Sequence, residues 1–339
     1  MFLFKPFFLL TLVLTNISFS WSQDSLHHFD NSFFHAQRFA HRGGYAVGPE
    51  NTVKTILYNI NHGVSAVEID VQLTRDNKLV VFHDDSISRV LNTDIKASPG
   101  ELTLAEIQNY PLRDSSQGVQ YLCSLEELID TLSILVPMHA IHDFLLEVDF
   151  KVKGEETKVG VDELTRITQH YVSEIGEQLY QYFFVSSFYP GVLREIRSYD
   201  EQINLAFAVH NNPLEHKLKA RMAILFAPII LRKYGAIIIE PNLCRVGTRF
   251  VKKYKRKGFL INTYTVNTEC EKRRIEKFNI AYTTNCPAGF CAHDSSGLVQ
   301  KNKKVCKQCS NQVVTSEKKK QADAEEEIKM TEEKLEGMK

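Results

Sequence analysis

The sequence shows no excess of either charge sign, because 41 lysine or arginine residues balance 41 aspartate or glutamate residues in a chain of 339. This balance argues against a protein that binds nucleic acid through general electrostatic attraction. Beyond the N-terminus no apolar run is long enough to cross a bilayer, so we expect no stable transmembrane anchor. No glycine-rich dinucleotide or phosphate loop follows the first strand candidate in a recognised spacing.

The N-terminal residues 1–23 have the composition of a signal peptide. One early lysine precedes an apolar run that starts at Phe7, and the small residues Ser18 and Ser20 follow it. The run is too short to span a bilayer comfortably, although a retained anchor is the alternative. We therefore expect export to a secreted, periplasmic or lumenal location.

Seven cysteines are present, and four of them, at positions 286, 291, 306 and 309, crowd toward the C-terminus as Cys-x4-Cys and Cys-x2-Cys. In an exported protein this spacing favours disulfides, whereas in a cytosolic protein it would favour a zinc site. We favour disulfides. The odd number leaves at least one thiol unpaired or intermolecular. The other three are Cys123, Cys244 and Cys270.

Short apolar runs alternate with helical patterns, which predicts a parallel sheet. Eight or nine strands in roughly 250 residues fit a TIM-type (β/α)8 barrel over residues 38–290, and a doubly wound open sheet is the alternative architecture. The strand candidates begin near Arg38, Ala66, Leu79, Phe144, Tyr182, Asn204, Ala236, Phe259 and Ile280. The helix candidates cover 52–62, 124–135, 161–172, 190–198, 217–233, 246–257 and 269–278.

Three segments do not follow the alternation. Residues 84–121 carry scattered Pro, Gly, Ser and Asp, and we expect a small insertion there, between a strand and its helix. Residues 291–311 form a Cys-containing extension, and residues 312–339 form a charged tail that is either helical or disordered.

Two carboxylates, Glu68 and Asp70, lie on one face of a predicted strand because strand side chains alternate between faces. Adjacent carboxylates repel each other unless a cation lies between them. A buried ion cluster with Arg or Lys is the structural alternative, but such clusters rarely add stability. Oxygen ligands suit Ca²⁺ or Mg²⁺ better than Zn²⁺ or Cu²⁺.

Two histidines, His41 and His83, each follow a strand candidate. A single histidine at a strand end is usually structural. The active sites of (β/α)8 barrels lie at the carboxyl ends of the strands, so two histidines there predict one general base and one general acid.

These residues fall in motifs that resemble the glycerophosphodiester phosphodiesterase family. HRGG-x4-PENT runs from His41 to Thr52, and EIDVQLTRDNKLVVFHD runs from Glu68 to Asp84. The resemblance continues through SSF at 186–188, YTVN at 264–267 and TNCP at 284–287, and it covers about residues 39–287. It implies a barrel whose mouth is capped by the insertion. The implied reaction is hydrolysis of a glycerophosphodiester to glycerol phosphate and an alcohol.

The resemblance also implies roles for the motif residues. A divalent cation, Ca²⁺ or Mg²⁺, is expected on Glu68 and Asp70, and Arg42 is expected to hold a phosphate oxygen while the adjacent glycines leave room for the phosphate. Glu50 is expected to shape its loop and contact the glycerol hydroxyls. Tyr264 replaces a tryptophan of the family and forms an aromatic wall. His41 and His83 exchange protons with the nucleophile and the leaving alkoxide.

The third metal ligand departs from the family pattern, which is Glu-x-Lys on the third barrel strand. Here the segment reads LLEVDFKVK, so Asp149 followed by Lys151 fits if aspartate replaces glutamate. We favour Asp149 as the ligand with Lys151 as a phosphate partner. Glu147 lies on the same face and is the alternative ligand.

Two other functions fit the same fold. One is a phosphodiesterase that cleaves the headgroup of a lysophospholipid or sphingolipid. The other is an exported binding protein that has lost catalysis, which the complete set of motif residues disfavours. In each case the expected partner is a small phosphodiester, and the sequence does not predict an oligomeric state.

Overall fold

The computed structural model describes residues 31–135, 144–209 and 217–287. The expected signal peptide, the Cys-containing extension and the charged tail lie outside these residues. Among the described residues, no helix has the length and apolar character that a membrane span requires.

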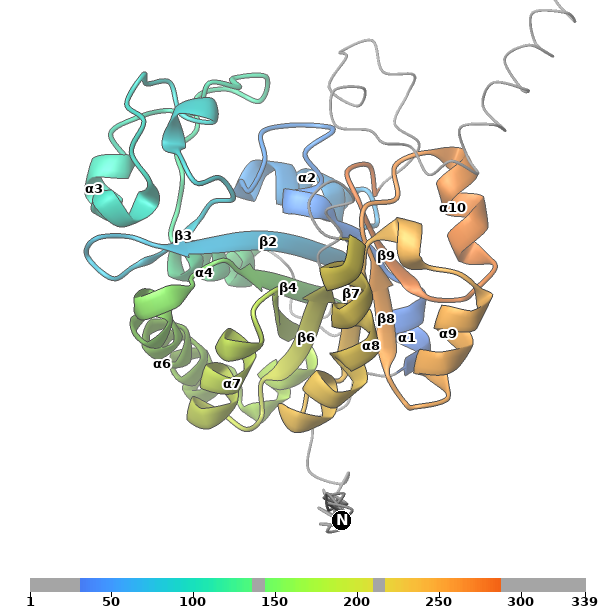
Figure 1. The fold of residues 1–339 in the computed structure, drawn as a ribbon. Helices are drawn as coiled ribbons and strands as arrows, with labels where there is room; N and C mark the ends of the chain where they lie inside the picture. Colours follow the sequence, from blue (N-terminus) through green and yellow to red (C-terminus); the bar gives the residue numbers. More distant parts are fainter. Residues whose placement is uncertain (1–30, 136–143, 210–216, 288–339) are drawn as a thin grey trace, which may run out of the picture.

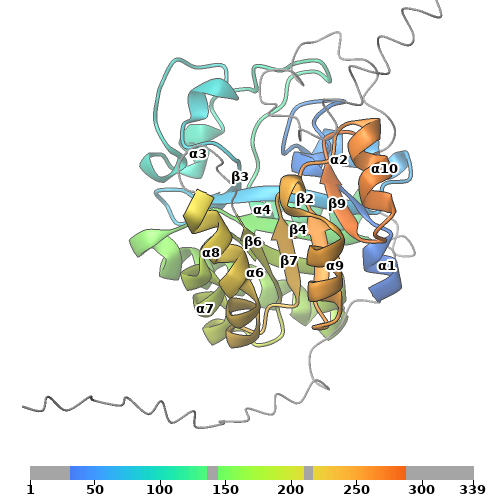
Figure 2. The ribbon, with the colours of Figure 1, turned by 45° about the vertical axis from the view of Figure 1, so that its right-hand side comes forward.

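Eight parallel strands close into a barrel, which confirms the predicted fold (Figures 1 and 2). The sheet order is β1-β9-β8-β7-β6-β5-β4-β2-β3, and an additional pairing of Ala40 with Val67 joins β1 to β2 and closes the ring. All nine predicted strands are present. They are β1 (Arg38–Ala40), β2 (Ala66–Leu73), β3 (Leu79–Val81), β4 (Leu145–Phe150), β5 (Phe183–Ser187), β6 (Asn204–Val209), β7 (Ile238–Pro241), β8 (Leu260–Thr263) and β9 (Ala281–Thr284).

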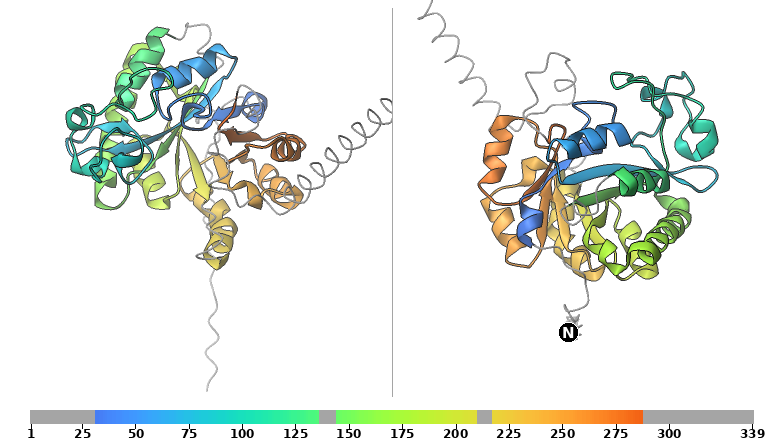
Figure 3. Two further views of the ribbon diagram at one scale, coloured as in Figure 1. Left: turned by 90° about the horizontal axis from the view of Figure 1, so that it is seen from above. Right: turned by 180° about the vertical axis from the view of Figure 1, so that it is seen from behind.

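Helices cover the outside of the barrel, and each of the seven predicted helical segments coincides with one, although α6 extends beyond the predicted range at both ends (Figures 1 and 3). These are α2 (Val53–Asn61), α4 (Leu125–Leu135), α6 (Thr157–Ile175), α7 (Pro190–Tyr199), α8 (Lys217–Lys233), α9 (Thr248–Lys255) and α10 (Glu269–Glu276). Capping residues explain where two of these helices begin. Thr52 accepts a hydrogen bond from the Thr55 N–H and so caps α2, and Thr268 with Glu271 forms a capping box on α10.

Strand β3 is not a barrel strand, although LVVFH reads like one. It runs antiparallel to β2, with Val71 opposite Val81 and Leu73 opposite Leu79. The chain turns at residues 74–78 and returns along the extended end of β2. His83 therefore reaches the barrel mouth through a hairpin, and the expectation that it follows a parallel strand is wrong.

The opposite end of the barrel is filled by an apolar layer built from the first residues of several strands. Ala66, Leu145, Ala206 and Ala281 belong to it and are at most 1% exposed. Phe34 of α1 (Asn31–His35) packs against this layer and is fully buried. The fold therefore begins before residue 38, because the short α1 helix supplies a ring that closes this end.

The insertion has an apolar cluster of its own and lies beside the β2–β3 hairpin (Figure 1). It contains the short helices η3 (Ile87–Arg89), η4 (Pro99–Glu101) and α3 (Leu104–Ile107). Ile87, Leu91 and Ile107 are fully buried and pack with Val80 and Phe82 of the hairpin. The hairpin and the insertion thus share one small core, which holds residues 84–121 in place.

Of the four clustered cysteines, Cys286 lies within the described residues, and it is disulfide-bonded. This agrees with the preference for disulfides over a zinc site. Cys291, Cys306 and Cys309 lie outside the described residues.

Candidate active site

The register between β2 and β4 stacks carboxyl groups in layers inside the barrel. Glu68 pairs with Glu147 and Asp70 pairs with Asp149, one layer closer to the mouth. Because parallel strands in this register direct paired residues to the same face, all four side chains point into the barrel. The apolar pair Ala66 and Leu145 lies beneath them.

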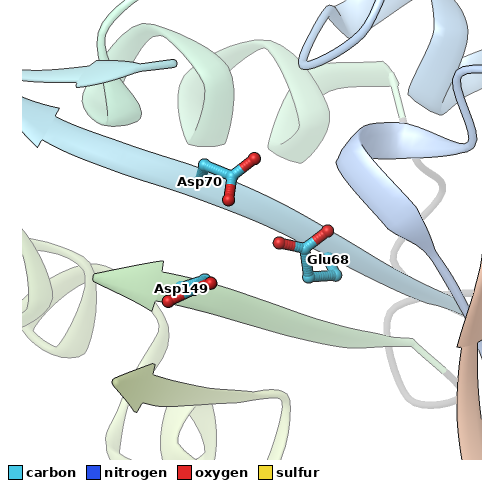
Figure 4. A group of neighbouring side chains, drawn as sticks. All are labelled: Glu68, Asp70 and Asp149. Atoms are coloured by element: carbon cyan, nitrogen blue, oxygen red, sulfur yellow. The ribbon is translucent and has the colours of Figure 1, made fainter. Parts of the chain in front are cut away.

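Three of these carboxyl groups form a cluster that could hold a metal ion (Figure 4). Glu68, Asp70 and Asp149 each offer an oxygen, and these oxygens lie within 4.8 Å of one another. All three side chains are buried, and Asp149 Oδ1 is buried without a hydrogen-bond partner. An oxygen-only donor set with one unused buried oxygen fits a hard divalent cation such as Ca²⁺ or Mg²⁺.

One lysine and one arginine also contact the carboxylate cluster. Such contacts were the expectation of the alternative in which Glu68 and Asp70 belong to a buried ion cluster. Lys151 Nζ lies 3.0 Å from Asp70 Oδ1 and also pairs with Asp149, while Arg42 Nε lies 3.6 Å from Asp70 Oδ2. These two cations are outnumbered by the carboxyl groups around them. Five carboxyl groups line this part of the cavity, namely those of Glu68, Asp70, Glu147, Asp149 and Glu240.

The imbalance appears in the proton affinity of the carboxyl groups. Burial raises the pKa of Glu68 well above its ordinary value, and the charges of Asp70 and Asp149 raise it further. Burial acts in the same sense on Asp70, but Lys151, His83 and Arg42 outweigh it and hold the Asp70 pKa well below its ordinary range. Proton binding is therefore favoured at Glu68 and disfavoured at Asp70, and a divalent cation bound beside Glu68 would lower its pKa.

Glu147 lies one layer deeper and has its own partners. Its carboxyl group accepts hydrogen bonds from Ser186 Oγ at 3.0 Å and from Asn262 Nδ2 at 3.0 Å. Asn262 also donates to Glu240, whose pKa is raised to about 8, chiefly by burial. Both glutamates therefore belong to a buried hydrogen-bond network beneath the cluster, which leaves Asp149 as the β4 carboxylate grouped with Glu68 and Asp70.

The HRGG segment turns sharply after β1 and forms the 3₁₀ helix η2 (His41–Gly43). Arg42 adopts a left-handed backbone conformation with φ of 50°, and its N–H donates to Glu68 Oε2 at 2.7 Å. Gly43 and Gly44 also have positive φ, and a Cβ atom on Gly43 would lie 2.8 Å from Ile56 of α2. The glycines therefore allow the turn and the close approach of α2. They are not among the residues that line the cavity, and the expectation that they leave room for a phosphate stays a prediction.

Residues of the PENT loop hold other site residues in place through hydrogen bonds. Asn51 donates to Asp70 Oδ2 at 3.0 Å and accepts from the Asp70 N–H at 3.2 Å, so it holds both the carboxylate and the backbone of Asp70. Glu50 accepts from Arg42 at 3.1 Å and from two nitrogens of Arg89 at 2.6 and 2.9 Å. Glu50 is not among the residues that line the cavity, so the structure places it as a support of the two arginines.

His41 is held by the last strand of the barrel. Its Nδ1 lies 2.7 Å from Asn285 Oδ1, and Asn285 Nδ2 donates to Tyr45 Oη at 2.9 Å. With the amide nitrogen engaged by Tyr45, Asn285 Oδ1 accepts a hydrogen bond from the Nδ1–H of His41, so Nε2 is the unprotonated nitrogen of the neutral ring. Burial and the neighbouring Arg42 lower the pKa of His41 to about 3, so the ring is neutral at pH 7.

His83 has a different partner, a carboxylate. Its Nδ1 lies 2.7 Å from Asp84 Oδ1, and the other Asp84 oxygen pairs with Arg89 Nε. Partial burial raises the pKa of Asp84, but the hydrogen bonds from His83 and Arg89 outweigh it, so this pKa lies well below its usual range. Asp84 is therefore ionised at neutral pH and orients the His83 ring.

A cavity of about 1090 Å³ brings these groups together at the mouth of the barrel. Its walls include the insertion, through Ser86, Ser88 and Arg89, and the aromatic residues Phe188 and Tyr264. The two rings meet edge to face at 6.0 Å, and the Tyr264 hydroxyl donates to the Val209 carbonyl at 2.9 Å. Of the predicted site residues, the cavity is lined by His41, Arg42, Glu68, Asp70, His83, Glu147, Asp149, Lys151 and Tyr264.

Sequence reasoning missed two contributors, Asn285 and Arg89. Barrel closure could have revealed Asn285, because β1 and β9 are neighbours and pair Ala40 with Thr284. The residues after those two positions are His41 and Asn285. No comparable signal identifies Arg89, which lies in a 3₁₀ helix of the insertion.

Comparison with known proteins identifies the family of this chain. Residues 41–282 match the model of the glycerophosphoryl diester phosphodiesterase family. Glycerophosphodiester phosphodiesterase 1 of Mus musculus is 26% identical over 278 residues, which cover 75% of this chain and 78% of that protein. A glycerophosphodiester phosphodiesterase of Caldanaerobacter subterraneus is 29% identical over 243 residues, which cover 71% of this chain and 90% of that protein.

Solved structures share the fold. A phosphodiesterase from Oleispira antarctica, determined with the product sn-glycerol-3-phosphate, superposes with a TM-score of 0.59 at 20% identity, covering 74% of this chain and 94% of that one. A glycerophosphodiester phosphodiesterase from Thermotoga maritima gives a TM-score of 0.53 at 18% identity, covering 76% of this chain and 95% of that one. The chain is therefore an enzyme that hydrolyses glycerophosphodiesters, and it belongs to the glycerophosphoryl diester phosphodiesterase family.

Proposed function

We propose that the enzyme cleaves small glycerophosphodiesters, such as glycerophosphocholine and glycerophosphoethanolamine, to glycerol 3-phosphate and an alcohol. In this proposal a divalent cation, Ca²⁺ or Mg²⁺, is required, and His41 and His83 supply the acid and base. The observation that carries the proposal is the meeting of both histidines, Arg42 and the three clustered carboxylates in one cavity.

Glu68, Asp70 and Asp149 would hold the cation. When bound there, a divalent ion supplies Lewis-acid stabilisation of the negative charge on the phosphate oxygens. The chain's own contribution is to keep the three carboxylates in place. The Arg42 N–H holds Glu68, and Asn51 holds Asp70, so neither carboxylate has to reorganise when charge develops.

Arg42 and Lys151 would bind the phosphate directly. Arg42 lines the cavity, and its pairing with Asp70 through Nε and with Glu50 through Nη1 fixes the plane of the guanidinium beside the place where a phosphate oxygen would bind. Lys151 lies between Asp70 and Asp149, which keep its pKa above the ordinary lysine value despite burial. Tyr264 and Phe188 would limit the space for the rest of the substrate.

His41 would act as the general base. Its neutral ring has Nδ1–H donated to Asn285 and a lone pair on Nε2, which can accept a proton from the nucleophile. The nucleophile is a water molecule or a hydroxyl group of the substrate itself. As that oxygen bonds to phosphorus, its proton passes to His41.

His83 would act as the general acid. The ionised Asp84 beside Nδ1 stabilises a protonated ring, which can donate a proton to the oxygen that leaves phosphorus. The bond from phosphorus to the headgroup oxygen breaks, and the alcohol departs neutral. The two rings therefore gain and lose one proton in each cycle.

The substrate class is tested by phosphorus NMR of the products. We expect glycerophosphocholine to give glycerol 3-phosphate, and a lysophospholipid to react at least about 100-fold more slowly, because most of the residues that line the cavity are charged or polar. Faster cleavage of the lysolipid would instead identify a lipid-headgroup phosphodiesterase. A cyclic phosphate among the early products would identify a substrate hydroxyl as the nucleophile.

We also propose that the enzyme is exported after removal of residues 1–23. The disulfide at Cys286 supports this, because disulfides persist mainly in oxidising compartments. We expect intact-mass measurement of the protein purified from its native host to show a chain that lacks these residues. A mass that includes residue 1 would favour the retained anchor.

A further inference from the structure

Helix α8 exposes apolar side chains where a surface helix normally exposes polar ones. Leu225 is 59% exposed, Phe226 is 44% exposed and Ile229 is 61% exposed. Their spacing of one and four residues places them on one face. On the opposite face, Ala227 and Leu231 are fully buried against the barrel. From residue 224 to residue 231 the helix is therefore apolar all round, which is unusual for a helix at a water-facing surface.

Basic side chains continue this face toward the C-terminal end of α8. Arg232 and Lys233 are exposed in the last turn of α8, three and four residues after Ile229, and so continue the same face. Neither α8 nor α9 contains an aspartate or a glutamate, although the whole chain has as many acidic as basic residues. The balance of charge in the chain therefore conceals a local excess of positive charge.

Helix α9 lies beside α8 and adds to the positive charge (Figures 1 and 2). The Tyr254 hydroxyl of α9 donates to the Ile224 carbonyl of α8 at 2.8 Å, which joins the two helices. Arg249 and Lys252 of α9 and the adjacent Arg256 are exposed. Apolar side chains flanked by arginine and lysine match the interface of a bilayer that contains anionic lipid.

We propose that α8 and α9 form a docking surface for an anionic lipid bilayer. In the docked state Leu225, Phe226 and Ile229 enter the boundary between headgroups and acyl chains, and the basic side chains contact lipid phosphate groups. The proposal is independent of the cavity, because none of these residues lines it.

Two other occupants fit the observations less well. A second copy of the chain, docked through the same face, would oppose two positively charged surfaces, which costs free energy. Nucleic acid would match the positive charge, but it offers no apolar environment for Leu225 and Ile229. A bilayer satisfies both the apolar and the charged parts of the surface.

The test measures partitioning of the purified chain onto sedimented vesicles of phosphatidylcholine and phosphatidylserine in a 3:1 ratio. We expect the Leu225→Glu/Ile229→Glu variant to bind about tenfold more weakly or worse, because two apolar side chains no longer enter the bilayer. The matched control is Ile134→Glu, the same kind of change at an isoleucine of α4 that is 81% exposed. This control should bind like the original chain.

A second variant, Arg232→Gln/Lys233→Gln, tests the charge and does not disturb the apolar residues. We expect about a twentyfold loss on the same vesicles, because each basic side chain near an anionic surface contributes about fivefold. Vesicles of phosphatidylcholine alone should bind the original chain and this variant equally. Circular dichroism checks that each variant is folded, and if the glutamate variant is not, the charge variant alone decides.

Equal partitioning of the original chain and both folded variants would overturn the proposal. So would sedimentation velocity showing that the apolar face forms a dimer which the glutamate variant dissociates. Tighter binding to a DNA duplex than to the anionic vesicles would likewise assign the surface to nucleic acid.

Discussion

The His41→Ala and His83→Ala variants are each expected to lose about 10²–10⁴-fold in kcat/KM on glycerophosphocholine, while their circular dichroism stays native. The loss follows from chemistry, since an alkoxide leaves phosphorus slowly without a proton and an unassisted hydroxyl is a weak nucleophile. Neither ring belongs to the hydrophobic core clusters, so the fold should survive both changes.

The two variants should respond differently to a better leaving group. A glycerol phosphodiester of 4-nitrophenol needs no proton on its departing oxygen, so it should restore most of the activity of His83→Ala. It should not restore His41→Ala, because activation of the nucleophile is still missing. His62→Ala, at the exposed histidine that directly follows α2, is the matched control and should retain normal rates. Full activity of either active-site variant would contradict the acid–base assignment, and equal rescue of both would contradict the division of roles.

Chelation is the second change with a large expected effect. EDTA should lower turnover by roughly 10²–10³-fold or more, and added Ca²⁺ or Mg²⁺ should restore it. The physical reason is the surplus of buried carboxylate at Glu68, Asp70 and Asp149, which Lys151 and Arg42 neutralise only in part. The measurement is the initial rate before and after dialysis, with each ion added back separately. Normal turnover in thoroughly chelated protein would contradict a catalytic metal.

A matched pair of substitutions identifies the third ligand. Asp149→Asn should weaken binding of the restoring ion at least about tenfold in calorimetry, because a ligand oxygen loses its charge. Glu147→Gln should change it less than about threefold. Burial and the neighbouring Glu240 raise the pKa of Glu147 well above its ordinary value, so glutamine resembles its protonated form. The opposite ranking of the two variants would make Glu147 the ligand.

Much of the fold could be predicted from local patterns. Each of the nine strand candidates and seven helix candidates coincides with an element of the expected type. Both the spacing of apolar residues and the capping residues lie within short segments of the sequence. Thr52, which caps the start of α2, is an example. The error at β3 has a physical cause, because LVV has the same composition whether its partner strand is parallel or antiparallel. Strand direction depends on the turn at residues 74–78 and on the insertion that packs against it.

The candidate site likewise has some features that the sequence predicts and others that only the structure shows. Glu68 and Asp70 share a face because of strand periodicity. The preference for Asp149 over Glu147 rested on the resemblance, because Asp149 and Lys151 match the Glu-x-Lys pattern of the family. The roles of Glu50 and the two glycines required the structure. Glu50 has the charge expected of a ligand for hydroxyl groups, but Arg42 and Arg89 occupy both of its oxygens. Gly43 is required by its positive φ and by Ile56, which approaches from another element.

The sequence by itself determined the elements, their order and the residue types that can carry phosphodiester chemistry, since these depend on periodicity and side-chain chemistry within short segments. Only the tertiary structure decided that Asn285 holds His41 and that Arg89 joins Asp84 to Glu50. It also decided that three apolar residues of α8 face outward beside basic side chains. Each of these facts is a contact or an exposure created by barrel closure and helix packing, and spacing along one chain does not contain it.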